Sequence, residues 1–381
     1  MIKRNIYLLW GIALLQGMVF YAPVATLYRQ AAGLGIFHIT LIESISLALM
    51  LLLEIPWGWL ADRIGYRKTM LICCFLYFVS KIIFWQAEGF SGFLLERILL
   101  SVVCAGLSGV DAGMLYLSCK EEESLRVFSI YENLGQLGIL AAAGIHAVWI
   151  GANYRLAAFL TVCSYGAAML LSFGLQEVSA GSAAARKNNP AGMLTVLKKQ
   201  LGNPKVLLLL LAVGLLNECH QTITVFLSQL QYIKVGMNHR EISMAYIVIN
   251  LLSLTGGFSA ALCRKFGVKS VGTGLLLLAA ISCLMLGMVP LPLVSVAALI
   301  ALRLSFCLMQ PLQMDLQNKQ ITGKDRATVL SINAVVLESL GIFLNLLLGS
   351  LADVQLSFAM FLGAVLCGLG AVLYRCSFSR Q

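Results

Sequence analysis

Long apolar runs, separated by short polar stretches, follow one another along the whole chain. Each run has about 20 residues or more, the length that a helix needs to cross the hydrocarbon core of a membrane. The predicted helices cover residues 6–28, 38–60, 69–87, 92–118, 125–149, 154–175, 204–232, 240–262, 269–289, 292–318, 326–350 and 356–374. Because most connections between them are short, consecutive helices are expected to lie antiparallel.

One connection, residues 176–203, is much longer than the others. It begins with SAGSAAARKNNPAG, a composition typical of a flexible linker. The stretch that follows, MLTVLKKQLGNP, has apolar residues on one helical face and Lys198, Lys199 and Gln200 on the other. That pattern indicates a helix lying on a membrane surface. The sequence therefore predicts a six-helix bundle at 1–178, a cytoplasmic linker with an interfacial helix at 179–203, and a second six-helix bundle at 204–381.

The composition is that of a membrane protein. Apolar residues make up 60% of the chain and charged residues 12%, whereas a soluble protein has about 25% charged residues. The net charge of +10 does not indicate nucleic-acid binding, because the basic residues lie in the loops between apolar runs rather than in one patch. The 11 cysteines are scattered without metal-binding spacing, and the common catalytic and nucleotide-binding motifs are absent. We therefore expect no cofactor, no metal site and no enzymatic activity.

The distribution of Lys and Arg predicts the orientation. With both termini in the cytoplasm, 20 of the 27 basic residues lie in cytoplasmic segments and four in external ones. Cytoplasmic loops of membrane proteins are enriched in Lys and Arg, so this orientation is favoured. The other three, Lys81, Arg97 and Arg303, fall inside predicted spans. We expect a monomeric, multi-pass protein of the cytoplasmic (inner) membrane of a bacterial-type cell.

The densest charge cluster between two apolar runs reads GWLADRIGYRKTML, at residues 58–71. Its pattern, G-x-L-A-D-R-x-G-x-R-K-x-x-L, resembles the loop between the second and third helices of major facilitator superfamily transporters. YAPVATLY at 21–28, SGVDAGMLY at 108–116 and the stretch from RATVLS to GSLAD at 326–353 are similar to the first, fourth and eleventh helices of bacterial members. The resemblance implies an all-α integral membrane fold with twelve transmembrane helices in two pseudo-symmetric six-helix bundles around a midplane site.

Residues of this motif predict a conformational latch on the cytoplasmic side. Gly58 allows close helix approach, Gly65 allows a sharp turn, and Asp62 can make a contact in one conformation that breaks in another. The latch residues are Gly58, Asp62, Arg63, Gly65, Arg67 and Lys68. The alternative is a positively charged cytoplasmic loop that only determines the orientation of the helices in the membrane. A weaker second copy of the motif aligns Gly267 with Gly65 and lacks the acid.

Charged and polar residues inside the spans are the candidates for proton coupling and substrate binding. A charge inside the membrane is energetically costly unless it is paired, hydrated or functional. The proton-coupling candidates are Arg97, Glu218, His220, Arg303 and Glu338. The substrate-cavity candidates are Gln16, Tyr21, Tyr131, Asn217, Gln221 and Gln310. Arg303 is expected to pair with an acid, Glu338 for structure or Glu218 for function. Snorkelling of Arg97 and a hydrogen-bond network around His220 are the structural alternatives.

The resemblance implies a secondary transporter that works by alternating access, with a small molecule and protons (or Na⁺) as partners in the lipid bilayer. Buried acids outnumber buried bases, which favours proton coupling and a cationic or neutral substrate. We expect proton-coupled export of a small amphipathic compound, such as a drug. The fifth helix lacks the G-P-x-x-G-G signature of proton-linked drug antiporters. Proton-coupled uptake of a nutrient or other small metabolite is therefore an alternative. A transport-inactive membrane receptor is an alternative of another class.

Overall fold

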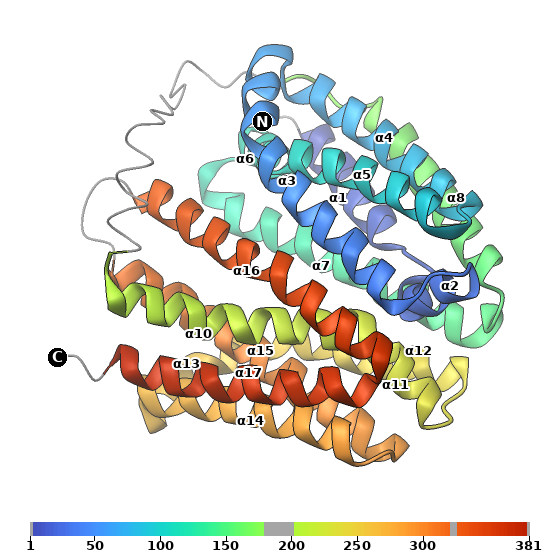
Figure 1. Cartoon of the computed structure of the whole chain (residues 1–381). Coiled ribbons are helices and arrows are strands. Elements are labelled where there is room, and N and C mark those ends of the chain that lie inside the picture. The colour runs from blue at the N-terminus through green and yellow to red at the C-terminus, as the bar shows by residue number, and fades with distance from the viewer. Residues whose placement is uncertain (1–2, 179–201, 321–325, 379–381) are drawn as a thin grey trace. The chain divides into compact units, whose positions relative to one another are not determined.

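The computed structural model describes residues 3–178, 202–320 and 326–378, and in these ranges the chain is helical apart from short connections (Figure 1). The first part contains α1 (Lys3–Gly17), η1 (Ala22–Val24), α2 (Ala25–Ala31), α3 (Ile36–Ile64), α4 (Tyr66–Gln86), α5 (Gly89–Leu107), α6 (Val110–Ser118), η2 (Glu121–Glu123), α7 (Ser124–Ile145), η3 (His146–Ile150) and α8 (Tyr154–Ser172). The second part contains α10 (Pro204–His220), η4 (Gln221–Leu227), α11 (Ser228–Lys234), α12 (His239–Leu251), η5 (Leu252–Phe258), α13 (Ser259–Phe266), α14 (Val268–Met288), α15 (Pro292–Gln320), α16 (Arg326–Val354) and α17 (Leu356–Ser377).

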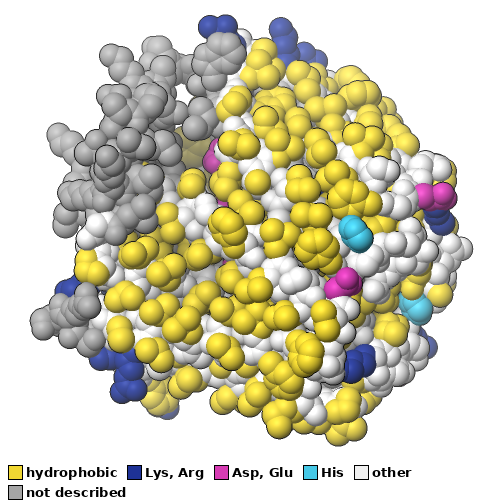
Figure 2. Space-filling model, viewed as in Figure 1, with side chains coloured by type: hydrophobic (Ala, Val, Ile, Leu, Met, Phe, Trp, Pro, Cys, Tyr) yellow, Lys and Arg dark blue, Asp and Glu magenta, His cyan; other side chains and the backbone are white. Residues whose placement is uncertain are grey.

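Among the described residues, 11 helical segments are long and apolar enough to cross a membrane, or 12 if the bent pair α12 and α13 forms one span. Their bounds follow the predicted spans closely, and the expected all-α membrane fold is confirmed. Hydrophobic side chains cover most of the face drawn in Figure 2, while Lys and Arg lie mainly towards its edges. This surface suits contact with lipid. The interfacial helix predicted before Pro204 lies outside the described residues.

Contacts divide the chain into two compact units. The first comprises Met1–His38, Ile45–Ala185 and His239–Ile247, and the second comprises Ile39–Ser44, Arg186–Asn238 and Val248–Gln381. The predicted division into 1–178, 179–203 and 204–381 stays a prediction. The start of α3 groups with the second unit, and the start of α12 groups with the first.

The first unit contains an interrupted helix. Helix α1 ends at Gly17, and the chain continues without helical structure until η1 begins at Ala22. Side chains of α8 bind the backbone groups that this break frees: the N–H of Phe20 donates to Thr161 Oγ1 at 3.0 Å, and Ser164 Oγ donates to the carbonyl of Leu15 at 2.7 Å. A break inside a membrane span is stable only when such partners are present.

Glycines allow α1 to pack closely on α7 beside this break. A Cβ atom added to Gly17 would collide with the carbonyl oxygen of Gly135, and one added to Gly138 would collide with that of Leu14. Small residues let membrane helices approach this closely. The contact therefore fixes the end of α1 just before the interruption.

In the second unit, α17 packs against both α10 and α14, and Figure 1 shows α14 and α17 side by side. Helix α10 continues through a π-helical segment, η4, before α11. Short π-helical segments are frequent at functional sites. This one begins directly after His220, where the predicted polar residues gather.

Candidate functional site

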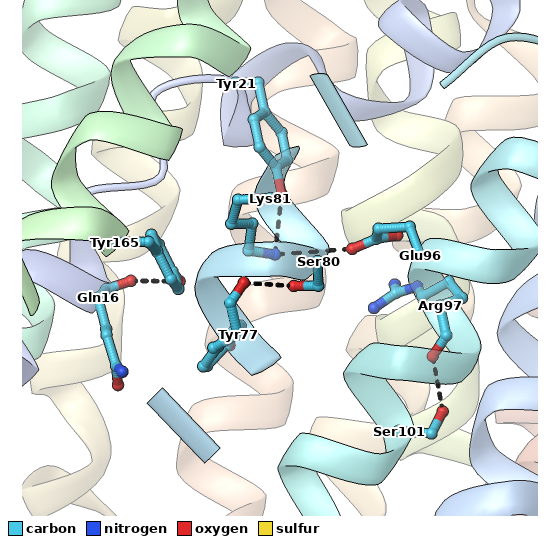
Figure 3. A network of polar contacts seen from close by, with 9 residues as sticks. All are labelled: Gln16, Tyr21, Tyr77, Ser80, Lys81, Glu96, Arg97, Ser101 and Tyr165. Carbon is cyan, nitrogen blue, oxygen red and sulfur yellow. Dashed lines mark hydrogen bonds and ion pairs between the residues drawn. The ribbon is translucent and has the colours of Figure 1, made fainter. Parts of the chain in front are cut away.

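A buried ion pair lies beside the break in the first helix. Lys81 of α4 and Glu96 of α5 are 4% and 1% exposed, and Lys81 Nζ lies 3.6 Å from Glu96 Oε1. Lys81 Nζ also donates to the hydroxyl of Tyr21 at 3.2 Å (Figure 3). Tyr21, a predicted cavity residue, is held there because it follows the interruption after Gly17.

Three tyrosine rings surround the Lys81 ammonium group. Its Nζ lies 5.1 Å from the ring centroid of Tyr77, 5.3 Å from that of Tyr165 and 5.9 Å from that of Tyr21. A cation within about 6 Å of an aromatic centroid is attracted by the ring's negative face. We call Tyr21, Tyr77, Tyr165 and Glu96 the ammonium cage. Its members come from α4, α5, α8 and the segment between α1 and η1.

Further contacts hold the ammonium cage in place. Tyr165 donates its hydroxyl to the carbonyl of Gln16 at 2.6 Å, and Tyr21 stacks on Phe84 with 4.0 Å between centroids. In Figure 3 the Arg97 side chain extends beside Glu96, from the next position of α5. Ser101, one turn later, donates to the carbonyl of Arg97 at 2.9 Å. Arg97, a predicted coupling residue, thus borders the cage.

The second unit brings two other predicted coupling residues together. Arg303 Nη1 lies 3.2 Å from His220 Nε2, and the His220 ring stacks on Phe306 with 3.9 Å between centroids. A guanidinium group only donates hydrogen bonds, so His220 Nε2 is the acceptor in this contact and the imidazole is neutral. His220 is 1% exposed. The site thus consists of a buried neutral imidazole between a partly buried guanidinium group and a partly buried phenyl ring.

This contact corrects the expectation that Arg303 pairs with an acid. Among the described residues, no ion pair joins Arg303 to Glu218 or Glu338, and its partner is His220. The geometry of α10 gives the reason. Two residues along a helix correspond to about 200° of rotation, so His220 faces α15 while Glu218 faces α16.

Glu218 packs against the backbone of α16. A Cβ atom added to Gly341 would lie 2.7 Å from the Glu218 carboxyl carbon, so a larger residue at this position would require the carboxyl group to move. Glu218 is partly buried, and the described residues provide it with no hydrogen bond or ion pair. Glu338 precedes Gly341 by about one turn of α16.

A chain of amide groups lies on the neighbouring faces of α10 and α15. Gln310 Nε2 donates to Asn217 Oδ1 at 3.0 Å, and Asn217 Nδ2 donates to Gln313 Oε1 at 3.4 Å. Gln221, one turn after Asn217, is exposed. Two of the predicted cavity residues, Asn217 and Gln310, are therefore in direct contact.

The other predicted cavity residues have separate environments in the first unit. Gln16 Nε2 lies 3.7 Å from Cys74 Sγ, and Tyr131 donates to Asp111 Oδ2 at 3.1 Å. Neither contact includes a member of the ammonium cage. Gln16 nevertheless touches that cage through its backbone carbonyl, which Tyr165 binds.

The motif loop joins α3 to α4 as predicted. Gly65 has φ 90° and ψ 160°, and Gly267, its counterpart in the second copy, has φ 80° and ψ 146°. Only glycine adopts this region readily. The Arg67 N–H donates to Glu177 Oε1 at 3.3 Å, and Arg67 Nε donates to the carbonyl of Leu175 at 2.7 Å. The loop is thus fastened to the segment after α8.

The remaining latch residues lie in α3 and at the start of α4. Arg63 and Lys68 are exposed. Gly58 lies within α3, and the side chain of Asp62 lies outside the part of the chain that the structure describes. The latch itself stays a prediction.

Sequence reasoning gave no role to Lys81 or Glu96. A signal was present, because both are charged residues inside apolar runs, and Tyr77 precedes Lys81 by four residues, which places the two on one helical face. Tyr165 carried no such signal, since an isolated tyrosine in an apolar helix is ordinary.

A bundle of membrane-crossing helices with ion pairs and amide chains inside its spans is typical of a membrane transporter. The chain belongs to the Major Facilitator Superfamily, whose sequence pattern matches residues 8–346. The predicted family is therefore confirmed, and the protein is a transporter rather than an enzyme. A search of curated protein sequences gives no match.

Several solved transporters share the fold. The nucleoside transporter NupG is 13% identical, with 99% of this chain and 100% of that one covered and a TM-score of 0.84. A bacterial homologue of the human lysosomal transporter Spinster, inward-facing and unoccupied, is 14% identical, with 98% and 97% covered and a TM-score of 0.78. The D-xylose-proton symporter is 12% identical, with 98% and 97% covered and a TM-score of 0.76. At these identities, the likeness shows the fold.

Proposed function

We propose that the protein is a proton-coupled secondary transporter in which Glu218 carries the proton. The proposal depends on one observation about Glu218. Its carboxyl group lies in the middle of a membrane span and has no hydrogen bond or ion pair among the described residues. An unpaired carboxylate is costly at this depth, and binding a proton removes its charge. Glu218 therefore has a physical reason to exchange protons whenever water reaches it.

Neighbouring groups support this role. Asn217 precedes Glu218 and is bound to Gln310 of α15, so amide donors and acceptors lie at the same level of α10 as the carboxyl group, on another face of the helix. Amides can bind polar groups of a substrate without adding charge. His220 is engaged by Arg303, and that cation disfavours a second positive charge on the imidazole. Of the two candidates on α10, Glu218 is therefore the better proton carrier.

In the proposed cycle, the protein alternates between conformations open to either side of the membrane. Proton binding at Glu218 removes a charge and favours one conformation, and substrate binding favours the other. The exported compound is amphipathic, because the polar groups described above occur among aromatic and aliphatic side chains. The latch residues around Gly65 act at the cytoplasmic side, with both termini on that side of the cell's inner membrane, and one chain is sufficient.

The test uses inverted membrane vesicles that contain the protein, a pH-sensitive dye and an acidic lumen. Amphipathic amines, neutral drugs, sugars and nucleosides are added in turn. Export by proton exchange predicts that the lumen becomes more alkaline on addition of a substrate. Proton-coupled uptake, the alternative within the same family, predicts further acidification instead, because substrate and proton then move in the same direction.

The matched variants are Glu218→Gln and Glu123→Gln. Both replace one carboxylate with an amide of similar shape, but Glu123 is exposed in η2 and lies outside the spans. We expect Glu218→Gln to abolish the pH response and Glu123→Gln to retain it. An unchanged response in Glu218→Gln contradicts the proposal. Saturable substrate binding without any flux in the wild type would instead indicate a receptor.

A further inference from the structure

The ammonium cage has the composition of a binding site for an organic cation. Two tyrosine rings, the hydroxyl group of Tyr21 and one carboxylate surround a single positive charge, and aromatic sites of this kind recognise organic ammonium ligands. Here the charge belongs to Lys81, whose Nζ contacts all four cage members. The lysine thus occupies the position that an ammonium ligand would take.

Lys81 fills this position incompletely. Charge-assisted N–H···O bonds measure about 2.7–2.9 Å, whereas Lys81 Nζ lies 3.6 Å from Glu96 Oε1. The other carboxylate oxygen, Glu96 Oε2, is buried and has no hydrogen-bond partner among the described residues. Glu96 is only 1% exposed. A fully buried carboxylate therefore retains an unused acceptor inside the cage.

The surrounding structure allows Lys81 to be replaced. Tyr21 lies in the interrupted part of the first helix, outside the α-helical hydrogen-bond ladder, and its carbonyl accepts only the first bond of η1, from the Val24 N–H at 2.9 Å. Lysine has a flexible stem of four carbons, so its ammonium group can leave the cage while α4 stays in place. Glu96 and the other two tyrosines lie within continuous helices and remain as a preformed site.

We propose that the cage formed by Tyr21, Tyr77, Tyr165 and Glu96 is a recognition site for an organic ammonium ion, which the Lys81 side chain occupies in this conformation as an internal substitute for the ligand. A transported amine or quaternary ammonium compound takes the place of Lys81. This assignment rests on the proposed function in one respect, namely that the ligand is also transported, and it names the substrate class.

The first test is chemical rescue of Lys81→Ala in the purified full-length protein. The substitution removes three carbons and the nitrogen, which propylammonium can replace. We expect propylammonium to raise the unfolding temperature of Lys81→Ala by several degrees, whereas NaCl at equal ionic strength does not. The wild type should respond less than Lys81→Ala, because its own ammonium group competes for the cage, and the double variant Lys81→Ala/Glu96→Gln should not respond. No rescue, or equal stabilisation of all three proteins, would overturn the proposal.

The second test needs only the wild type and does not depend on how Lys81→Ala folds. A membrane-permeant, amine-reactive ester labels Lys81 only while its amine is outside the cage, and mass spectrometry measures the labelled fraction. Tetramethylammonium does not react with the ester. We expect it to increase labelling of Lys81 and to leave that of Lys269, an exposed lysine, unchanged. Labelling of Lys81 that does not rise with tetramethylammonium would contradict the proposal.

The two tests separate this proposal from the proposed function, because neither measures proton flux. Glu218→Gln should retain the labelling response to tetramethylammonium even if it abolishes proton exchange. If rescue and labelling fail while the pH response persists, the ammonium site is wrong and proton-coupled transport stands. If rescue and labelling succeed without any pH response, the site is correct and the coupling mechanism is wrong.

Discussion

Gly138→Ala tests whether the close contact of α1 with α7 determines the geometry of the ammonium cage. The added Cβ would lie within 3.1 Å of the backbone of Gly17 and would collide with the carbonyl oxygen of Leu14. These neighbours are backbone atoms, which cannot rotate away as a side chain can. Helix α1 must therefore move away from α7, and Tyr21, which follows its end, must move with it.

Gly135→Ala is the matched control. It lies on the same helix, three residues earlier, and its added Cβ would meet only the carbonyl oxygen of Ala13, at 3.9 Å. Both substitutions gain about 1 kcal/mol from the higher helix propensity of alanine. Overpacking costs about 1–3 kcal/mol, and only Gly138→Ala incurs this cost. The difference in unfolding free energy between the two variants is therefore about 1–3 kcal/mol.

Thermal unfolding of the two purified variants measures this difference. For a domain of 150–250 residues, each kcal/mol shifts the midpoint by about 2–4 °C, and we expect Gly138→Ala to unfold at the lower temperature. Transport should fall in Gly138→Ala and remain near the wild-type rate in Gly135→Ala. Equal midpoints and equal transport rates would refute the claim that this contact positions the end of α1.

Two further predictions concern buried charge and backbone conformation. Lys81→Met leaves the Glu96 carboxylate buried without its partner, which costs about 3–5 kcal/mol of unfolding free energy. The double variant Lys81→Met/Glu96→Gln should recover part of this loss. A thermal midpoint of the double variant no higher than that of Lys81→Met would contradict the pairing. Gly65→Ala and Gly267→Ala should each lose about 1–3 kcal/mol of unfolding free energy, because only glycine adopts their backbone region readily. Gly65→Ala should lose more, because its added Cβ displaces the Glu177 carboxylate, which accepts a hydrogen bond from the Arg67 N–H. A smaller loss than in Gly267→Ala would argue against that contact.

Much of the fold could be predicted because a membrane allows few solutions. A backbone in lipid must satisfy its own hydrogen bonds, so an apolar run of sufficient length is a helix, and the predicted spans match the observed ones. The interruption at residues 18–21 could not be predicted in this way, because the apolar run continues through it. Its partners, Thr161 and Ser164, lie more than 140 residues away in the sequence. They become apparent only when α8 is placed against α1.

The same limit explains which site residues were found. Polar side chains concentrated on α10 were visible in the sequence, and two of them contact predicted residues of α15. Which groups pair depends on the rotation of each helix about its axis, and the sequence does not specify that rotation. Arg303 was therefore expected to meet Glu218 or Glu338, but it meets His220. The role of Lys81 required the packing of α4, α5 and α8 around one point.

The two units accommodate buried charge in different ways, and each way suits a different task. In the first unit, Lys81 neutralises Glu96, so the cage carries no net charge until the lysine leaves, and a ligand that replaces Lys81 must itself be a cation. In the second unit, Glu218 has no cation beside it among the described residues, and a proton is the smallest ion that can neutralise it. Exchange of a cation at one site against a proton at the other would transport one positive charge in each direction. This exchange requires both sites, so Glu96→Gln should abolish the pH response to amines while Glu218 still binds a proton. A full pH response in Glu96→Gln would mean that the ammonium cage takes no part in transport.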